Sequence, residues 1–323
     1  MWSPSKCLAA FPASTHESDI EQIKETHKRI LSDPEAYMKE KNGFLNPSDI
    51  ANVDGNPEDR MAQILARRRE VCIYDKELQN APVLHYMCNH KEEVRMLIHF
   101  YAFLYFQDWK QQLWGYRFVR DHLRYLDEIQ CAAARIVNEL RLRAATQDPN
   151  NKEGLFDSFH IRRGDFQYKN VKVNATVLYK ASMDKITEKS LVYIATDEQD
   201  KNFFQPLREH YDIVFLDDFK HLLEGLNTNY FGMVDQLVAS RGRVFFGTFY
   251  STFTGYINRM RGYHVDTEKL KGWEDGTMNS YYFFPNSRKY EMRKYAPIKS
   301  SNWPREFPVA WRDIDKGIST LMQ

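Results

Sequence analysis

The stretch that decides the fold is Leu-Val-Tyr-Ile-Ala at residues 191–195, followed at once by Thr-Asp-Glu at residues 196–198. The five residues are rich in β-formers and show no alternation of polar and apolar side chains. Such a run is typical of a strand buried on both faces, as in the parallel sheets of α/β proteins. Because ligands of these sheets bind beyond the carboxyl ends of the strands, the residues that follow each strand are candidates for a site.

The same pattern continues on both sides of this stretch. Short apolar runs predict further strands at residues 155–161, 213–216 and 244–247. Amphipathic segments between the runs predict helices at residues 174–188, 199–211, 230–240 and 251–262. Strands that alternate with helices of this length indicate a parallel, right-handed α/β sheet.

The chain before residue 150 has a different character. Residues 18–40 are charge-rich with scattered apolar positions, and apolar residues recur at helical spacing over 92–106 and 119–140. Residues 144–154 are polar and contain a proline and a glycine, which favours a linker. We therefore predict a largely helical N-terminal region over residues 1–150 and a parallel α/β domain over residues 151–323.

Composition excludes several classes of protein. The 323 residues include 45 Lys and Arg against 44 Asp and Glu, and this net charge of +1 argues against a nucleic-acid-binding protein. No apolar run is long enough for a membrane-spanning helix, and we expect no signal peptide or membrane anchor in this sequence. The four cysteines form no Cys-x-x-Cys pair, which disfavours a zinc knuckle, and they neither demand nor forbid an oxidising compartment.

Two of the predicted strands end in loops that suit an anion. His-Ile-Arg-Arg-Gly-Asp-Phe at residues 160–166 supplies two arginines, whose planar forks pair with phosphate. Gly-Thr-Phe-Tyr-Ser-Thr-Phe at residues 247–253 places hydroxyl and backbone N–H groups at a helix N-terminus. A diphosphate needs both kinds of donor, so the residues favour a nucleotide-diphosphate-sugar ligand. The absence of GxGxxG and GxxxxGK[ST] disfavours a dinucleotide fold and a P-loop.

Each of these loops also has a structural interpretation. Residues 160–166 equally fit a surface turn with Arg–Asp salt bridges, and Ser251 equally fits a helix N-cap. Residues 196–198 and the pair Asp217-Asp218 are most simply interpreted as caps of the helices that follow them.

These segments also carry a family resemblance. Residues 160–166, residues 196–198 and FFGTFYSTFTGYINRMRGY at 245–263 resemble three conserved regions of the GDP-fucose-dependent O-fucosyltransferase superfamily. The superfamily includes protein O-fucosyltransferases and related α1,2- and α1,6-fucosyltransferases. The resemblance implies a GT-B fold, in which two Rossmann-like domains hold the donor in the cleft between them. Residues 151–323 would then be the GDP-sugar-binding domain and residues 1–150 the acceptor side.

The resemblance also implies roles for individual residues. Arg162 would be catalytic, because it would contact the diphosphate and assist the departure of GDP. The donor-binding residues implied are His160, Arg162, Arg163, Asp165, Asp235, Ser251, Thr252 and Phe253. Asp235 precedes Ser251 by 16 residues and matches the family's guanine-reading aspartate. From the residues alone, Asp235 is better explained as a polar position on the exposed side of its helix.

The activity that the resemblance implies is transfer of fucose from GDP-fucose to a hydroxyl group, first of all Ser or Thr of a protein, by inverting displacement. No metal or other cofactor is implied, and the partners are GDP-fucose and a protein or glycan acceptor. The implied location is the lumen of the ER or Golgi. The sequon Asn174-Ala175-Thr176 is compatible with that location.

The N-terminal region departs from the family pattern. Family members begin with a strand and a glycine-rich loop that shapes the acceptor side, and we expect no such element among residues 1–90. The N-terminal domain is therefore expected to be incomplete, and no catalytic base is identified. Two alternatives stay open, an oligosaccharide fucosyltransferase of the α1,2 or α1,6 type and a non-catalytic GDP-sugar-binding or scaffold protein.

Overall fold

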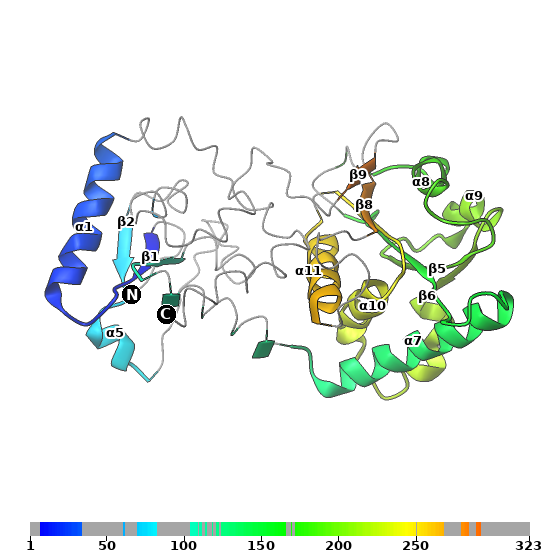
Figure 1. Ribbon diagram of the computed structural model, residues 1–323, viewed down its shortest axis with the longest axis horizontal. Helices are drawn as coiled ribbons and strands as arrows, with labels where there is room; N and C mark the ends of the chain where they lie inside the picture. The colour runs from blue at the N-terminus through cyan, green and yellow to red at the C-terminus, as the bar shows by residue number, and fades with distance from the viewer. Residues whose placement is uncertain are drawn as a thin grey trace. The chain divides into compact units, whose positions relative to one another are not determined.

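The computed structural model describes residues 7–33, 61, 70–82, 104–108, 110–111, 114, 118, 121–122, 124–165, 169, 172–249, 251–267, 279–283 and 289–291 (Figure 1). The chain forms two compact units. The first contains the described residues before Leu123, and the second contains those from Arg124 onward. The long helix α7 (Asp127–Gln147) therefore belongs to the second unit, ahead of the division predicted at residue 150.

The first unit is built on a parallel sheet with strand order β2-β1-β3. Its strands are β1 (Cys7–Phe11), β2 (Glu70–Ile73) and β3 (Leu104–Phe106), and its helices include α1 (Glu17–Ser32) and α5 (Lys76–Asn80). Helix α1 buries the face that carries Ile23, Thr26, His27 and Ile30, at the spacing of an amphipathic helix. Ile23 and Ile30 form a small core with Ala10, Met61 and Tyr105.

Two predictions for this region are wrong. The helix expected over 92–106 is a strand at Leu104–Phe106, which pairs with β1, and residues 92–103 lie outside the described part of the chain. The expectation that residues 1–90 contain no strand is wrong at β1 and β2, which add a parallel sheet to the helices of the N-terminal region. A short apolar run fits helix and strand equally well, and the alanine-rich β1 is a strand because it pairs on both sides.

The second unit contains the predicted parallel α/β sheet, which is confirmed. The strand order is β6-β5-β4-β7-β8-β9, with five parallel strands and an antiparallel edge strand. The strands are β4 (Asp157–Ile161), β5 (Leu191–Thr196), β6 (Asp212–Phe215), β7 (Phe245–Thr248), β8 (Ser280–Phe283) and β9 (Lys289–Glu291). The chain order reverses between β4 and β7, and in such sheets the ligand crevice lies at the reversal.

The helices of the second unit follow the predicted alternation. After α7 they are α8 (Ala175–Ser182), α9 (Gln205–Arg208), α10 (Phe231–Ser240) and α11 (Thr252–Thr267), with 3-10 turns η4 (Lys201–Phe204), η5 (Leu216–Leu222) and η6 (Thr228–Tyr230). The helix predicted over 199–211 is divided into η4 and α9, with Pro206 in the first turn of α9. Helix α10 packs between α7 and α11 and contacts β4 and β5 (Figure 1).

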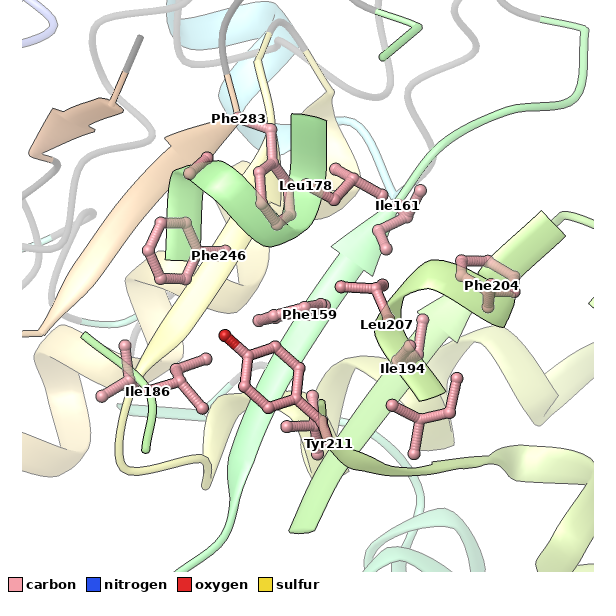
Figure 2. Close-up of a cluster of buried hydrophobic side chains, with 14 of the residues drawn as sticks. Phe159, Ile161, Leu178, Ile186, Ile194, Phe204, Leu207, Tyr211, Phe246 and Phe283 are labelled. Atoms are coloured by element: carbon pink, nitrogen blue, oxygen red, sulfur yellow. The ribbon is translucent and has the colours of Figure 1, made fainter. Parts of the chain in front are cut away.

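One face of the sheet carries a large apolar core (Figure 2). Phe159 at its centre is fully buried and meets Phe246 and Phe283 edge-on, at ring-centroid distances of 5.8 and 5.3 Å. Leu178 of α8 and Leu207 of α9 cover this face. Burying each side chain of this size contributes about 1.5–3 kcal/mol.

The alternation of side chains along each strand sends a second set of residues to the other face. Phe159 and Ile161 belong to the apolar core, so His160 between them points toward the opposite face. Val192 and Ile194 likewise belong to the core, and Tyr193 points away from it. This opposite face is the one that α10 and α11 cover, and the candidate site is built on it.

Two further features concern the environment of the protein. Cys72 on β2 is disulfide-bonded, whereas Cys131 on α7 is a free thiol. Among the residues that the structure describes, no helix has the length and apolar character needed to cross a bilayer.

Candidate functional site

The predicted anion loops are neighbours at the reversal of strand order. His160 of β4 pairs with Gly247 of β7, so the two strands end side by side. We call Arg162–Asp165, which follow β4, the β4 loop. On the other side, β7 ends at Thr248 and α11 begins at Thr252. Thr248 joins the two ends, because its Oγ1 accepts a hydrogen bond from Arg162 N at 2.9 Å.

The β4 loop is held by the residue that follows β5. Asp197 accepts hydrogen bonds from the backbone N–H groups of Arg163 and Gly164, at 2.6 and 2.9 Å. Its Oδ2 also lies 2.5 Å from the guanidinium of Arg162. Burial alone would raise the pKa of Asp197, but these N–H groups and the Arg162 charge together lower it. Asp197 is therefore an ionised anchor for the loop.

Residues 196–198 do not cap the next helix, which corrects the capping interpretation. Thr196 Oγ1 instead donates a hydrogen bond to Ile161 O at 2.7 Å, and Glu198 Oε2 accepts one from Arg163 Nε at 2.9 Å. The turn η4 is capped by Asp200, whose side chain accepts from Asn202 N at 3.0 Å. The polar turn after β5 thus organises the neighbouring loop, because parallel strands bring their carboxyl ends together.

The two arginines of the β4 loop point to different partners. Arg162 Nη2 donates to the carbonyl of Asp165 at 2.9 Å, and its side chain keeps 36% of its surface exposed. Arg163 donates to Val173 O at 3.1 Å and lies 3.9 Å above the ring of Phe203. Arg162 is thus the more exposed of the two arginines at the strand ends, while Arg163 ties the loop to the rest of the unit.

Residues 160–166 form salt bridges, as their structural interpretation predicted, but the acidic partners lie outside the segment. The acidic residues are Asp197 and Glu198 from the neighbouring strand end, and Asp165 contributes its backbone carbonyl to Arg162. Asp165 itself is exposed. A Cβ at Gly164 would overlap Asp197 Oδ2, so a larger residue there would displace the carboxylate that holds the loop.

The start of α11 forms the other half of the site. Ser251 is buried, and its carbonyl accepts the N–H of Gly255 at 3.0 Å, so it occupies the N-cap position that the residues allowed. The first N–H groups of a helix have no acceptor within the helix, and the helix dipole places partial positive charge there. Thr252 and Phe253 lie in this first turn. This turn therefore offers hydroxyl and N–H donors to an anion beyond the end of β7.

His160 is a buried support beneath this turn. Its Nδ1 lies 2.6 Å from Thr254 Oγ1, and its ring stacks on Phe253 at 4.5 Å between centroids. Burial lowers the pKa of His160 to about 3, although Asp197 opposes this shift, so the imidazole is neutral at physiological pH. Gly247 makes the arrangement possible, because a Cβ there would overlap the side chain of Thr254.

Asp235 faces the sheet, so its interpretation as an exposed polar position on α10 is wrong. It is partly buried, and its Oδ1 accepts a hydrogen bond from Tyr193 OH at 2.6 Å. Gly232 lies one turn earlier on α10, and a Cβ added to it would be 3.6 Å from the ring of Phe253, so this part of α10 lies next to Phe253. The Asp235 carboxylate, the Phe253 ring and His160 therefore lie on one face of the sheet. Burial raises the pKa of Asp235 to about 7, against the opposing hydrogen bond from Tyr193.

The structure thus brings together most of the predicted residues. Arg162, Ser251, Thr252 and Phe253 gather at the ends of β4 and β7, with His160 beneath them and Asp235 nearby on α10. Sequence reasoning missed Thr248, Thr254 and Tyr193, which carry hydrogen bonds within the site. The described residues contain no group of three His, Cys, Asp or Glu suited to a metal ion. Arg162 and the start of α11 contribute positive charge at this site.

A comparison with known families fits this arrangement. The family model for GDP-fucose protein O-fucosyltransferase matches residues 19–264. No curated protein matches the chain. The matched segment includes all the residues that form the candidate site, together with elements of both compact units.

Proposed function

Because the chain belongs to the GDP-fucose protein O-fucosyltransferase family, we propose that it transfers fucose from GDP-fucose to a Ser or Thr hydroxyl of a protein acceptor. Membership of this family implies a fucosyltransferase that uses GDP-fucose. The observation that carries the finer proposal is that the β4 loop and the start of α11 follow neighbouring strands at the point where the strand order reverses, and that Arg162 N bonds to Thr248 Oγ1 at the end of β7.

In this proposal the diphosphate of the donor lies between Arg162 and the first turn of α11. The Arg162 guanidinium presents a planar fork to phosphate oxygens, and Thr252 and the N–H groups of the first turn supply the remaining donors. Asp235 accepts hydrogen bonds from guanine N1–H and N2–H₂, a pair of donors that adenine lacks. Arg163 and Asp165 support Arg162 through the loop.

The chemical step is a direct displacement with inversion at the anomeric carbon. The acceptor oxygen forms a bond to C1 of fucose while the bond from C1 to the β-phosphate oxygen breaks, and the hydroxyl proton passes to the departing diphosphate. Negative charge develops on the departing GDP, and Arg162 and the helix N-terminus stabilise it. His160 is unsuited to act as the general base, because it is buried, stacked on Phe253 and bonded to Thr254.

We propose that the second unit is the donor half of a GT-B enzyme and the first unit its acceptor half. Strand β1 supports this division, because it supplies the strand of the strand and glycine-rich loop that the acceptor side was expected to lack. A non-catalytic GDP-sugar-binding protein is the second candidate, and one observation favours it. The residues between β1 and α1, Pro-Ala-Ser-Thr-His at 12–16, contain no glycine.

The location proposed is the secretory pathway, where members of this family typically act. The disulfide at Cys72 supports this location, because disulfides persist in the oxidising lumen and are rare in the cytosol.

The test is a transfer assay with GDP-fucose and folded protein acceptors, read as GDP release and as fucose mass on the acceptor. Wild-type protein should release GDP in step with transfer, and Arg162→Ala should lower the rate by roughly 10²–10³-fold. Arg143→Ala is the matched control, since Arg143 is an exposed arginine that pairs with Asp212. Guanine-specific binding without release or transfer for any acceptor would favour the non-catalytic protein.

A further inference from the structure

We propose that Tyr193 is a positioning residue for base recognition: its hydroxyl, 2.6 Å from Asp235 Oδ1, orients the carboxylate that meets guanine. The inference rests on the proposed function, because it takes Asp235 as the residue that meets the base. It adds a residue from β5 to a recognition element on α10.

Tyr193 is held firmly enough to act in this way. It lies in the middle of β5, where its neighbours in register are Ser158 of β4 and Val214 of β6. The side chain is fully buried, and its ring lies 6.3 Å from that of Phe219. The hydroxyl is therefore fixed relative to the sheet. A phenylalanine would fill the same space, so what the hydroxyl adds is its bond to Asp235.

The bond leaves Asp235 able to accept from a base. An ionised carboxylate offers about four lone-pair sites, and Tyr193 occupies one of them. The remaining sites fit the two donors of guanine, N1–H and N2–H₂, whereas hypoxanthine offers only N1–H. Loss of the hydroxyl would free the carboxylate to rotate about its side-chain torsions. Affinity for guanine and discrimination against hypoxanthine should then both decrease.

The charge state of Asp235 gives a second readout. The charges of Lys201 on η4 and Asp217 on η5 act on its pKa, in addition to the hydrogen bond from Tyr193. Burial raises the pKa of Asp235 to about 7, Tyr193 and Lys201 oppose this rise, and Asp217 adds to it. Only the ionised carboxylate accepts both guanine donors. Donor binding should therefore strengthen as the pH rises through the Asp235 pKa, and loss of the Tyr193 hydroxyl should move that transition to higher pH.

The experiment is a calorimetric titration with GDP-fucose between about pH 5.5 and 8.5. GDP-fucose is the probe because its diphosphate, esterified at both ends, has no group that titrates near neutrality. The variants are Tyr193→Phe and Asp235→Asn. Tyr211→Phe is the matched control, because Tyr211 is another buried tyrosine whose hydroxyl lies 3.2 Å from Ser182 Oγ within the core of the opposite face. Titrations with GDP and IDP at the upper pH measure base discrimination.

Wild-type protein and Tyr211→Phe should bind more tightly as the pH rises through about 7. Tyr193→Phe should bind roughly three- to tenfold more weakly at neutral pH, the loss expected for one hydrogen bond, with its transition at higher pH and a smaller preference for GDP over IDP. Asp235→Asn should show no such transition. A Tyr193→Phe profile identical to those of wild type and Tyr211→Phe overturns the inference alone. Wild-type protein that binds ADP as well as GDP overturns the proposed function.

Discussion

The guanidinium of Arg162 lies 2.5 Å from Asp197 Oδ2, which joins the first residue after β4 to the first residue after β5. The same carboxylate holds the backbone of the β4 loop through the N–H groups of Arg163 and Gly164. The position of Arg162 thus depends on a residue that need not touch the donor. Asp197 is a positioning residue in this account, and its replacement should affect donor binding.

Replacing Asp197 with alanine should weaken GDP-fucose binding by at least about tenfold, because Arg162 loses its ion pair and two partly buried N–H groups lose their acceptor. The free energy of unfolding should fall by about 1–3 kcal/mol for the same reason. Calorimetry and chemical denaturation measure the two effects. Asp212→Ala, which removes an exposed pair with Arg143, should change stability by no more than about 1 kcal/mol and leave binding unchanged. Equal binding by both variants would contradict the role given to Asp197.

Gly164→Ala should reproduce much of the Asp197 effect without removing a charge. The new Cβ would overlap Asp197 Oδ2, so the carboxylate must move away from the loop. Gly232→Ala is the comparison for stability, because its Cβ would meet Phe253 at an ordinary 3.6 Å within helix α10. That change should stabilise the helix by about 0.5–1 kcal/mol. A thermal unfolding series shows whether Gly164→Ala is the destabilised variant of the two; if it is not, the packing at Asp197 is misassigned.

The stability of the protein should depend on pH through His160. Its pKa is lowered to about 3 in the folded state, from an ordinary value of 6.5. The unfolded chain therefore binds the extra proton between these two values. Stability should fall as the pH drops below 6.5, by up to about 1.4 kcal/mol per pH unit from this group. His160→Gln lacks the titration, so the difference between the two denaturation profiles isolates it. Parallel profiles would mean that His160 titrates normally in the folded protein.

Arg261 lies inside the motif at 245–263, and we expect it to stabilise the fold rather than to contact the donor. It is buried, donates to Ser280 Oγ at 2.8 Å, and also donates to the carbonyls of Ser240, Gly242, Arg243 and Asn279. Arg261→Met would remove a donor from each of these carbonyls, although Asn279 O keeps its bond from Phe245 N, and should cost roughly 3–5 kcal/mol. Arg143→Met, at an exposed ion pair, should cost less than about 1 kcal/mol. Urea unfolding of the two variants measures this contrast, and similar losses would count against it.

The sequence predicted the second unit well because its signals are local. The run at 191–195 is buried on both faces as β5, and the loop after each strand lies at the sheet edge where it was expected. Asp235 could be assigned to the site only through the family resemblance, because the helical pattern of residues 230–240 does not predict which face of the helix packs on β5. Asp197 was interpreted as a cap, because its true partners are 33 and 34 residues away in the chain.

The first unit was predicted poorly for a related reason. Its strands are three to five residues long and pair with segments far apart in the sequence. Ala9 of β1 meets Cys72 on one side and Leu104 on the other, and no local pattern records such pairings. Short apolar runs of this kind are strands only in the context of the sheet.

The central claim is that the ends of β4 and β7 bind the diphosphate of a guanine nucleotide sugar through Arg162. The most direct measurement is calorimetric titration of wild-type protein and Arg162→Ala with GDP-fucose, GDP and ADP. The account predicts that wild-type protein binds the two guanine ligands at about micromolar affinity, near −8 kcal/mol, that ADP does not bind, and that Arg162→Ala loses at least about tenfold in affinity. Absence of guanine-nucleotide binding, or equal binding by the Arg162→Ala variant, would contradict the claim.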